Sequence, residues 1–242
     1  GNLLAENPLV KKSGEWHRKL ITPYDCRIQR RHEAPIGDTH RWDSGMYAEG
    51  FAKLASFYKD CDAEFAKEMV GTSMLLHESK TAASKEAPQI NLKELVVSID
   101  GSIPATPAKE MDWSSAAFEG FGAVMRDGFG TDGESFVSYK AGEARGHYHN
   151  DESSFHFYAG GTPIALDYNC SYTPRGDHAS LHNSVTFGRS AELVHNGTGR
   201  KIEAQEELTS TGKVIHFSTT EAADLVVSER SGDQLVMRPV DP

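Results

Sequence analysis

"GHYHNDESSFHFYAGGTPIALDYNCSYTPRGDHASLHNSVTF", residues 146–187, differs in composition and pattern from the rest of this sequence. It contains five of the eleven histidines of the chain. Aromatic residues recur before Gly160-Gly161 and a short apolar run follows it, and the dipeptide itself tolerates the positive φ angles of a tight turn. We therefore expect a β-hairpin that pairs Ala159 with Thr162 and that gathers metal-ligand types of side chain around it.

A histidine pair opens this stretch. His147 and His149 share a face if the chain is extended there, because side chains alternate along a strand. Nitrogen and carboxylate donors suit Zn²⁺, Mn²⁺ or Fe²⁺. The hairpin register places Asp167 opposite Ser154, so His149 and Asp167 can share an ion only if residues 150–153 bend. The candidates for a third ligand are Asp151, Glu152, Asp167, His178 and His182.

The remainder of the chain divides by periodicity. Residues 1–42 are irregular in pattern, whereas 44–58 and 62–77 show helical spacing. From about residue 116 the period changes to two, in short runs separated by Gly, Asp and Asn, which is typical of an antiparallel sandwich. We therefore expect a mainly β protein with a helical N-terminal part: a helical segment at 1–80, a connecting loop at 81–115 and an antiparallel β-sandwich at 116–242.

Composition excludes several classes of function. The formal charge of −10 over 242 residues argues against nucleic-acid binding. No apolar run reaches the ~18 residues of a membrane span, and the opening residues lack a signal-peptide pattern. Cys26, Cys61 and Cys170 are odd in number and widely spaced, which predicts neither a disulfide framework nor a Cys-x-x-Cys metal site.

Two known families have motifs similar to this stretch. The cupins bind a metal through His-x-His, a later Glu and a distant His in a small β-barrel. Glu152 follows the pair here, and Pro174, Gly176 and His178 approximate the second cupin motif, but both spacings differ by about one residue.

The second family matches in order and phase without adjustment. The sequence resembles the heparinase II/III-like polysaccharide lyases over about residues 116–190. The motifs that carry the resemblance are Gly146-His147-Tyr148-His149-Asn150-Asp151, Ser154-Phe155, Gly160-Gly161, Leu166-Asp167 and His182-Asn183-Ser184-Val185.

The resemblance implies an antiparallel β-sandwich preceded by the end of an α/α toroid. "RRHEAPIGDTHRWDSG" is similar to the closing part of such a toroid, and Tyr24, His32 and His40 would border the cleft or serve ordinary packing roles. The chain would then be the C-terminal portion of a longer enzyme. That enzyme would be periplasmic or secreted, and its partners would be an anionic polysaccharide and either the rest of the toroid or a second copy.

The resemblance also implies site residues. The activity is β-elimination of uronic-acid polysaccharide, with His147 and Tyr172 as catalytic groups and Arg175 on a substrate carboxylate. The alternatives are packing for Tyr172 and an ion pair with an aspartate for Arg175. A structural zinc would be held by His149, Asp167 and His182, with Cys170 either a fourth ligand or a buried thiol. The alternatives are a cupin-like metal-dependent enzyme or sugar-binding protein, in which His178 is a ligand, and a non-catalytic carbohydrate-binding sandwich.

Overall fold

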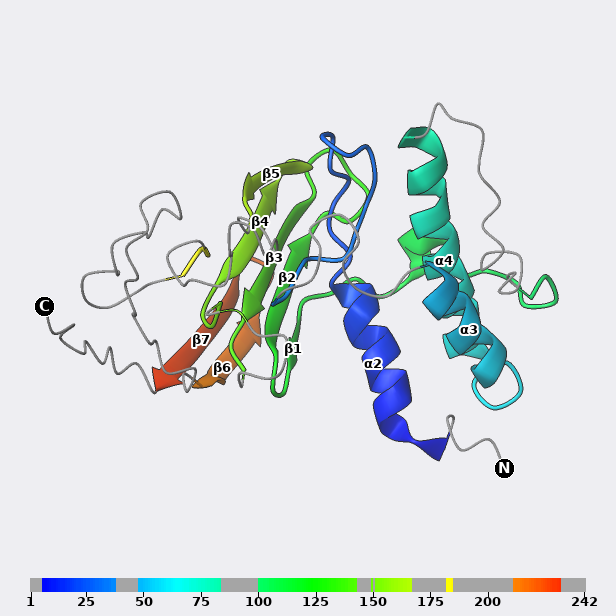
Figure 1. The fold of residues 1–242 in the computed structure, drawn as a ribbon, viewed down its shortest axis with the longest axis horizontal. Coiled ribbons are helices and arrows are strands. Elements are labelled where there is room, and N and C mark those ends of the chain that lie inside the picture. Colours follow the sequence, from blue (N-terminus) through cyan, green and yellow to red (C-terminus); the bar gives the residue numbers. More distant parts are fainter. Residues whose placement is uncertain are drawn as a thin grey trace, which may run out of the picture.

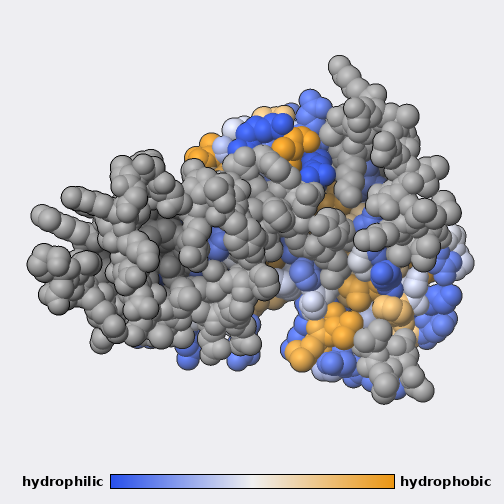
Figure 2. All heavy atoms as spheres, viewed as in Figure 1, coloured by the Kyte–Doolittle hydropathy of each residue, from blue (hydrophilic) through white to orange (hydrophobic). Residues whose placement is uncertain are grey.

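The computed structural model describes residues 6–37, 48–83, 100–142, 149, 151–166, 182–184 and 211–231. Figure 1 shows helices on one side and strands on the other, with the segment 20–37 running between them. No helix among the described residues is both long and apolar enough to cross a membrane. Leu9 and Ile164 are exposed apolar residues of the helical side and of the large sheet, and Ile215, Leu225 and Val227 are exposed on a strand hairpin at 211–231. Figure 2 shows hydrophobic residues among hydrophilic ones on the visible face of the described part.

Three helices make up the described helical part: α2 (Pro8–Lys19), α3 (Ala48–Tyr58) and α4 (Ala63–Ala83). The helices expected at 44–58 and 62–77 are present as α3 and α4, and α4 continues further. Helix α2 lies where an irregular segment was expected. The Asn7 side chain caps it by accepting a hydrogen bond from the Leu9 amide at 3.0 Å, and Pro8 occupies the first helical position.

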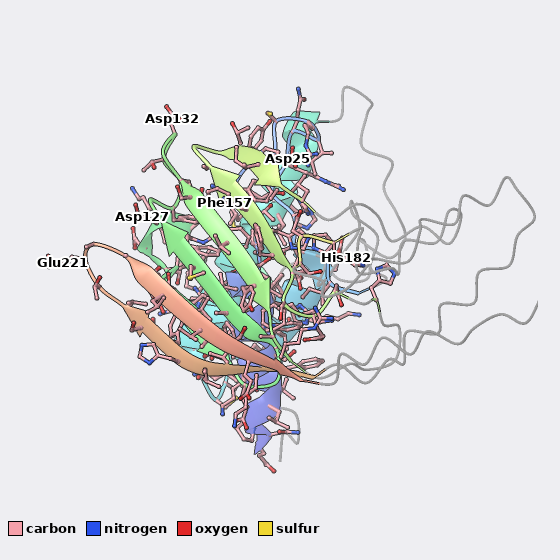
Figure 3. All side chains as sticks on the ribbon, turned by 90° about the vertical axis from the view of Figure 1, so that its left-hand side faces the viewer. Asp25, Asp127, Asp132, Phe157, His182 and Glu221 are labelled. Atoms are coloured by element: carbon pink, nitrogen blue, oxygen red, sulfur yellow. The ribbon has the colours of Figure 1, made fainter. Side chains whose placement is uncertain are left out.

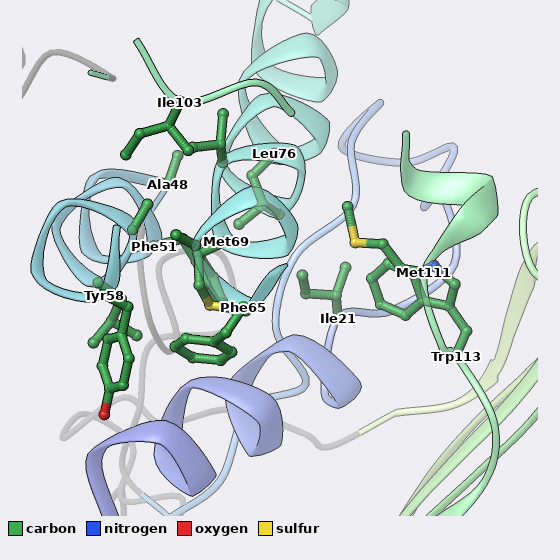
Figure 4. Close-up of a cluster of buried hydrophobic side chains, with 14 residues drawn as sticks. Ile21, Ala48, Phe51, Tyr58, Phe65, Met69, Leu76, Ile103, Met111 and Trp113 are labelled. Carbon is green, nitrogen blue, oxygen red and sulfur yellow. The ribbon is translucent and has the colours of Figure 1, made fainter. Parts of the chain in front are cut away.

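The helices share one apolar core with residues from other parts of the chain. Phe51 of α3 and Phe65 and Met69 of α4 are buried in it (Figure 4). Ile21 and Trp113, from the segments that lead to the sheet, belong to the same core. The helical part is therefore packed onto the rest of the protein through this core.

A five-stranded antiparallel sheet follows, in the order β1-β2-β3-β4-β5, and a separate two-stranded hairpin comes after it. The run "FEGFGAVMRDGF" forms two strands because the chain turns at Gly120, whose φ is 78°. The strands are β1 (Ala116–Phe118), β2 (Gly122–Asp127), β3 (Ser135–Lys140), β4 (Phe155–Ala159), β5 (Thr162–Ala165), β6 (Thr211–Thr219) and β7 (Asp224–Ser231). This confirms a mainly β fold with a helical N-terminal part.

The two faces of the large sheet have different partners. Val124, Phe136 and Tyr158 point to one face and are buried with Leu20 and Ala34 of the 20–37 segment. On the other face, the hydroxyl of Tyr139 is hydrogen-bonded to the hydroxyl of Ser228 on β7. Figure 3 shows the β6–β7 hairpin alongside β2 and β3. The sheet is thus covered on one side by the 20–37 segment and flanked on the other by the hairpin.

A buried ion network fixes the 20–37 segment to the turn between β2 and β3. Glu134 pairs with Arg126 and with Arg31, whose Nη2 lies 2.6 Å from the carboxylate. Arg126 also donates to the carbonyl of Ile21. The two arginines hold the pKa of Glu134 below its usual value, although burial alone would raise it. Glu134 is therefore ionised and joins the helical side of the protein to the sheet.

Candidate metal centre

The chain turns sharply just after His149. Ser153 adopts a left-handed φ of 62°, and its neighbour Ser154 donates a backbone hydrogen bond to the carbonyl of Asp151 at 3.0 Å. Left-handed backbone is uncommon in non-glycine residues, so this conformation must be stabilised by its surroundings. The described turn runs from Asp151 to Ser154. It overlaps residues 150–153, where a bend was predicted to be needed if His149 and Asp167 share an ion.

The β4–β5 hairpin has the expected turn and one unexpected shift. Ala159 pairs with Thr162 across Gly160-Gly161, as predicted. A bulge between Phe157 and Tyr158 then moves the register by one residue, so that Ala165 lies opposite Phe157. The pairing of Asp167 with Ser154 was predicted by extending the register of the turn along both strands. That extension does not hold, because the bulge shifts the register.

His149 and His182 are brought together by the fold. Their ring centroids lie 5.3 Å apart at an interplanar angle of 45°. The two residues are only 5% and 6% exposed. With Zn–N bonds of about 2.0–2.1 Å, two imidazoles on one tetrahedral ion hold their centroids roughly 5 Å apart. The spacing and burial of this pair therefore fit two ligands of one metal ion.

A hydrogen bond anchors the segment that carries His182. The side-chain amide of Asn183 donates to the carbonyl of Phe155 at 3.0 Å, at the first residue of β4. The Ser184 amide closes a tight bend by donating to the His182 carbonyl at 2.8 Å. The His-Asn-Ser motif thus places its histidine beside the start of β4, where the turn after His149 also ends.

The carboxylates nearest to His149 in the sequence are engaged elsewhere. Lys140 at the end of β3 pairs with Asp151 and lies 3.0 Å from Glu152. Burial alone would lower the pKa of Lys140, but the two carboxylates raise it above its usual value. Burial raises the pKa of Glu152. These pairings, and the open order of the described sheet, disfavour the cupin alternative, which needs Glu152 as a ligand inside a closed barrel.

Several candidate residues lie outside the described part of the chain: His147, Asp167, Tyr172, Arg175, His40, Cys170 and His178. Among the described residues there is no group of three or more His, Cys, Asp or Glu side chains with metal-binding geometry. The zinc site with Asp167 as its third ligand therefore stays a prediction, and so do the roles of His147, Tyr172 and Arg175.

Of the two further residues expected near the cleft, His32 has a packing role. It is buried, its Nε2 lies 3.1 Å from the Tyr158 hydroxyl, and its Nδ1 lies 2.9 Å from the Glu33 carbonyl. Burial lowers the pKa of His32 from 6.5 to about 4. Tyr24, in contrast, is exposed.

Sequence reasoning missed two polar groupings near this end of the sheet. The first is the Lys140 cluster, whose members belong to different elements. The second is a pair in which His17 Nδ1 of α2 lies 2.6 Å from a carboxylate oxygen of the buried Glu33. The sequence carries no local signal for either grouping, because tertiary packing brings their members together.

Comparisons with known proteins support the fold. No family model matches the chain, and no curated protein matches it. Two solved structures are similar over 90% of this chain: a heparinase III, at 13% identity and a TM-score of 0.55, and a second heparinase III, the BT4657 gene product, at 17% and 0.52. The chain spans 29% and 27% of the lengths of those proteins.

The family resemblance read from the sequence is thus confirmed at the level of the fold. The similarity includes both the helices and the antiparallel sheets, since it extends over nine-tenths of the chain. This protein has the fold of a part of heparinase III in which helices lead into an antiparallel β-domain.

Proposed function

We propose that this chain is a portion of a polysaccharide lyase that cleaves uronic-acid-containing polysaccharide by β-elimination. The observation that carries the proposal is the likeness of its fold to heparinase III over 90% of the chain. The close, buried approach of His149 and His182 supports it, because these are the two histidines that the lyase motifs assign to a structural metal.

The chemistry explains the residue types in the proposal. Elimination removes the C5 proton of a uronic acid, which is only weakly acidic although it lies next to a carboxylate. A positive or hydrogen-bonding group must stabilise the enolate that develops, a base must take the proton, and an acid must protonate the leaving oxygen. We assign binding of the substrate carboxylate to Arg175, whose guanidinium can bind it bidentately. We assign the two proton transfers to His147 and Tyr172.

In this proposal the metal has a structural role. His149, Asp167 and His182 would hold zinc, which supplies a rigid cross-link between the histidine turn and the strand ends. The burial of His149 and His182 keeps both rings away from solvent and from a polysaccharide. His147 precedes the bend and is left to interact with substrate, so the two members of the His-x-His pair would have different functions.

An absorbance assay tests the lyase proposal. β-Elimination leaves a C=C bond conjugated with the uronate carboxylate, so the ultraviolet absorbance grows as product forms. The complete encoded protein should produce this signal with at least one of heparan-type chains, alginate or ulvan. The 242-residue chain alone should show little or no turnover if the other catalytic groups belong to the toroid. A complete protein that binds these polymers but produces no unsaturated uronate would instead be a carbohydrate-binding protein.

A further inference from the structure

A buried cluster of one lysine and two carboxylates surrounds the turn that follows His149. The Lys140 side chain is 13% exposed, and those of Asp151 and Glu152 are 2% and 0% exposed. The Lys140 ammonium contacts both carboxylates. Buried charges are stable only when they are paired, so removing the lysine would leave two negative groups facing each other in the interior.

Lys140 holds the same turn through its backbone. Its amide donates to the Ser154 carbonyl at 2.9 Å, and its carbonyl accepts from the Ser153 amide at 2.9 Å. Side chain and main chain of a single residue thus act on both ends of the turn. This explains how Ser153 is kept in its left-handed conformation.

The two carboxylates extend these contacts to distant segments. Asp151 accepts a hydrogen bond from the Gly37 amide at 2.9 Å, at the end of the 20–37 segment. Glu152 accepts from the Gly142 amide at 3.0 Å, and its carbonyl accepts from Arg230 of β7 at 3.1 Å. The turn is therefore tied to the helical side, to the end of β3 and to the β6–β7 hairpin.

We infer that Lys140 is a positioning residue: together with Asp151 and Glu152 it fixes the conformation of the turn after His149, and this turn places His149 next to His182. The inference rests on the metal site of the proposed function. It adds to that site three residues that are not metal ligands. Groups that orient metal ligands affect metal affinity by roughly 10- to 100-fold when they are replaced. Lys140 would act in this way through the turn, without contacting the ion.

The fold offers a matched control for this inference. Glu134 lies just before the start of β3 and Lys140 lies at its end, and each belongs to a buried ion network. Arg31→Met removes an arginine from the first network, as Lys140→Met removes the lysine from the second. Both substitutions keep an apolar stem and should lower the melting temperature, but only Lys140 is joined to the turn after His149.

The experiment measures the zinc dissociation constant of the 242-residue chain by competition with a chromophoric chelator, at a temperature where every variant is folded. Lys140→Met should weaken zinc binding roughly 10- to 100-fold, Arg31→Met by less than about twofold, and Lys140→Arg should restore most of the affinity. If Lys140→Met does not fold, Glu152→Gln, which keeps an oxygen for the Gly142 amide, should weaken binding in the same direction.

The outcomes separate this inference from the proposed function. Equal zinc affinity for the wild type and Lys140→Met, or for the wild type and Glu152→Gln where Lys140→Met does not fold, would overturn the positioning role while leaving the metal site intact. A wild-type chain without measurable zinc affinity would overturn the metal site and the positioning role together. Lyase activity is not used as a readout, so its absence would bear on the catalytic proposal alone.

Discussion

The imidazole rings of His149 and His182 lie 5.3 Å apart between centroids, although a long stretch of sequence separates the two residues. Both are buried beside the start of β4: one precedes a strained turn, and the other is anchored by the Asn183 hydrogen bond to Phe155. The turn after His149 and the Asn183 hydrogen bond together place two side chains that suit a metal ion next to each other.

Replacing His147 should separate catalysis from metal binding. His147→Ala should leave zinc content and melting temperature within experimental error of the wild type, because the residue is assigned to substrate and not to the ion. In the complete encoded protein it should abolish the growth of ultraviolet absorbance on a cleaved polymer. Loss of zinc in this variant, measured by elemental analysis, would instead place His147 among the ligands.

Gly71 of α4 is expected to be intolerant of a side chain. A Cβ atom at this position would lie 2.0 Å from the backbone carbonyl oxygen of Thr106. Gly71→Ala should therefore destabilise the protein by about 1–3 kcal/mol, despite the higher helix propensity of alanine. Urea denaturation measures the change. Gly101→Ala is the control, because a Cβ there meets nothing within 4 Å, and it should alter stability by less than about 0.5 kcal/mol.

His32 should make stability depend on pH. Its pKa is about 4 in the folded protein, below the 6.5 expected of an unfolded chain, so between these values the unfolded state binds more protons. Stability is thus lost as the pH falls through this window, by up to about 1.4 kcal/mol per pH unit.

His32→Gln, which cannot be protonated, should flatten this loss in urea denaturation curves recorded from pH 7 to pH 4.5. His216→Gln, at an exposed position on β6, should keep the wild-type profile. An unchanged slope in His32→Gln would show that folding does not hold this ring in its neutral form.

Glu134 should be among the costliest charged residues to remove. Glu134→Ala would leave the buried Arg126 and the partly buried Arg31 without their carboxylate, and breaking a buried pair in this way costs about 3–5 kcal/mol. Chemical denaturation should show a loss of that size. The matching change at an exposed pair, Glu64→Ala, removes a carboxylate that is 83% exposed and should cost less than about 1 kcal/mol. Similar losses in both variants would contradict a stabilising role for the buried network.

The sequence predicted those features that local rules determine. Gly160-Gly161 specified the turn between β4 and β5, and the change in period at residue 116 coincides with the start of β1. Helix α2 was missed although Asn7 and Pro8 form a standard helix start, because the residues that it buries, Gly14, Arg18 and Lys19, are not apolar side chains at helical spacing. In this instance the start signal was more informative than the periodicity.

Other features could not be predicted because they depend on tertiary contacts. Gly71 and Thr72 weakened the helical pattern of α4, yet Gly71 makes room for the Thr106 carbonyl and Thr72 is buried, with its hydroxyl donating to the Glu68 carbonyl at 2.8 Å. The register shift between β4 and β5 and the pairing of Lys140 with Asp151 both follow from how neighbouring segments pack. Of the predicted metal ligands, His149 and His182 are brought together, while Asp167 lies outside the described residues.

The most direct test of the account is the zinc content and melting temperature of the purified chain, compared with those of His149→Ala and His182→Ala. We predict about one zinc per wild-type chain, loss of that zinc in both variants, and a lower melting temperature in each, because bound metal stabilises the folded state. A chelator should lower the melting temperature of the wild type only. A wild-type chain without zinc, or variants that retain it, would contradict the metal site on which the account depends.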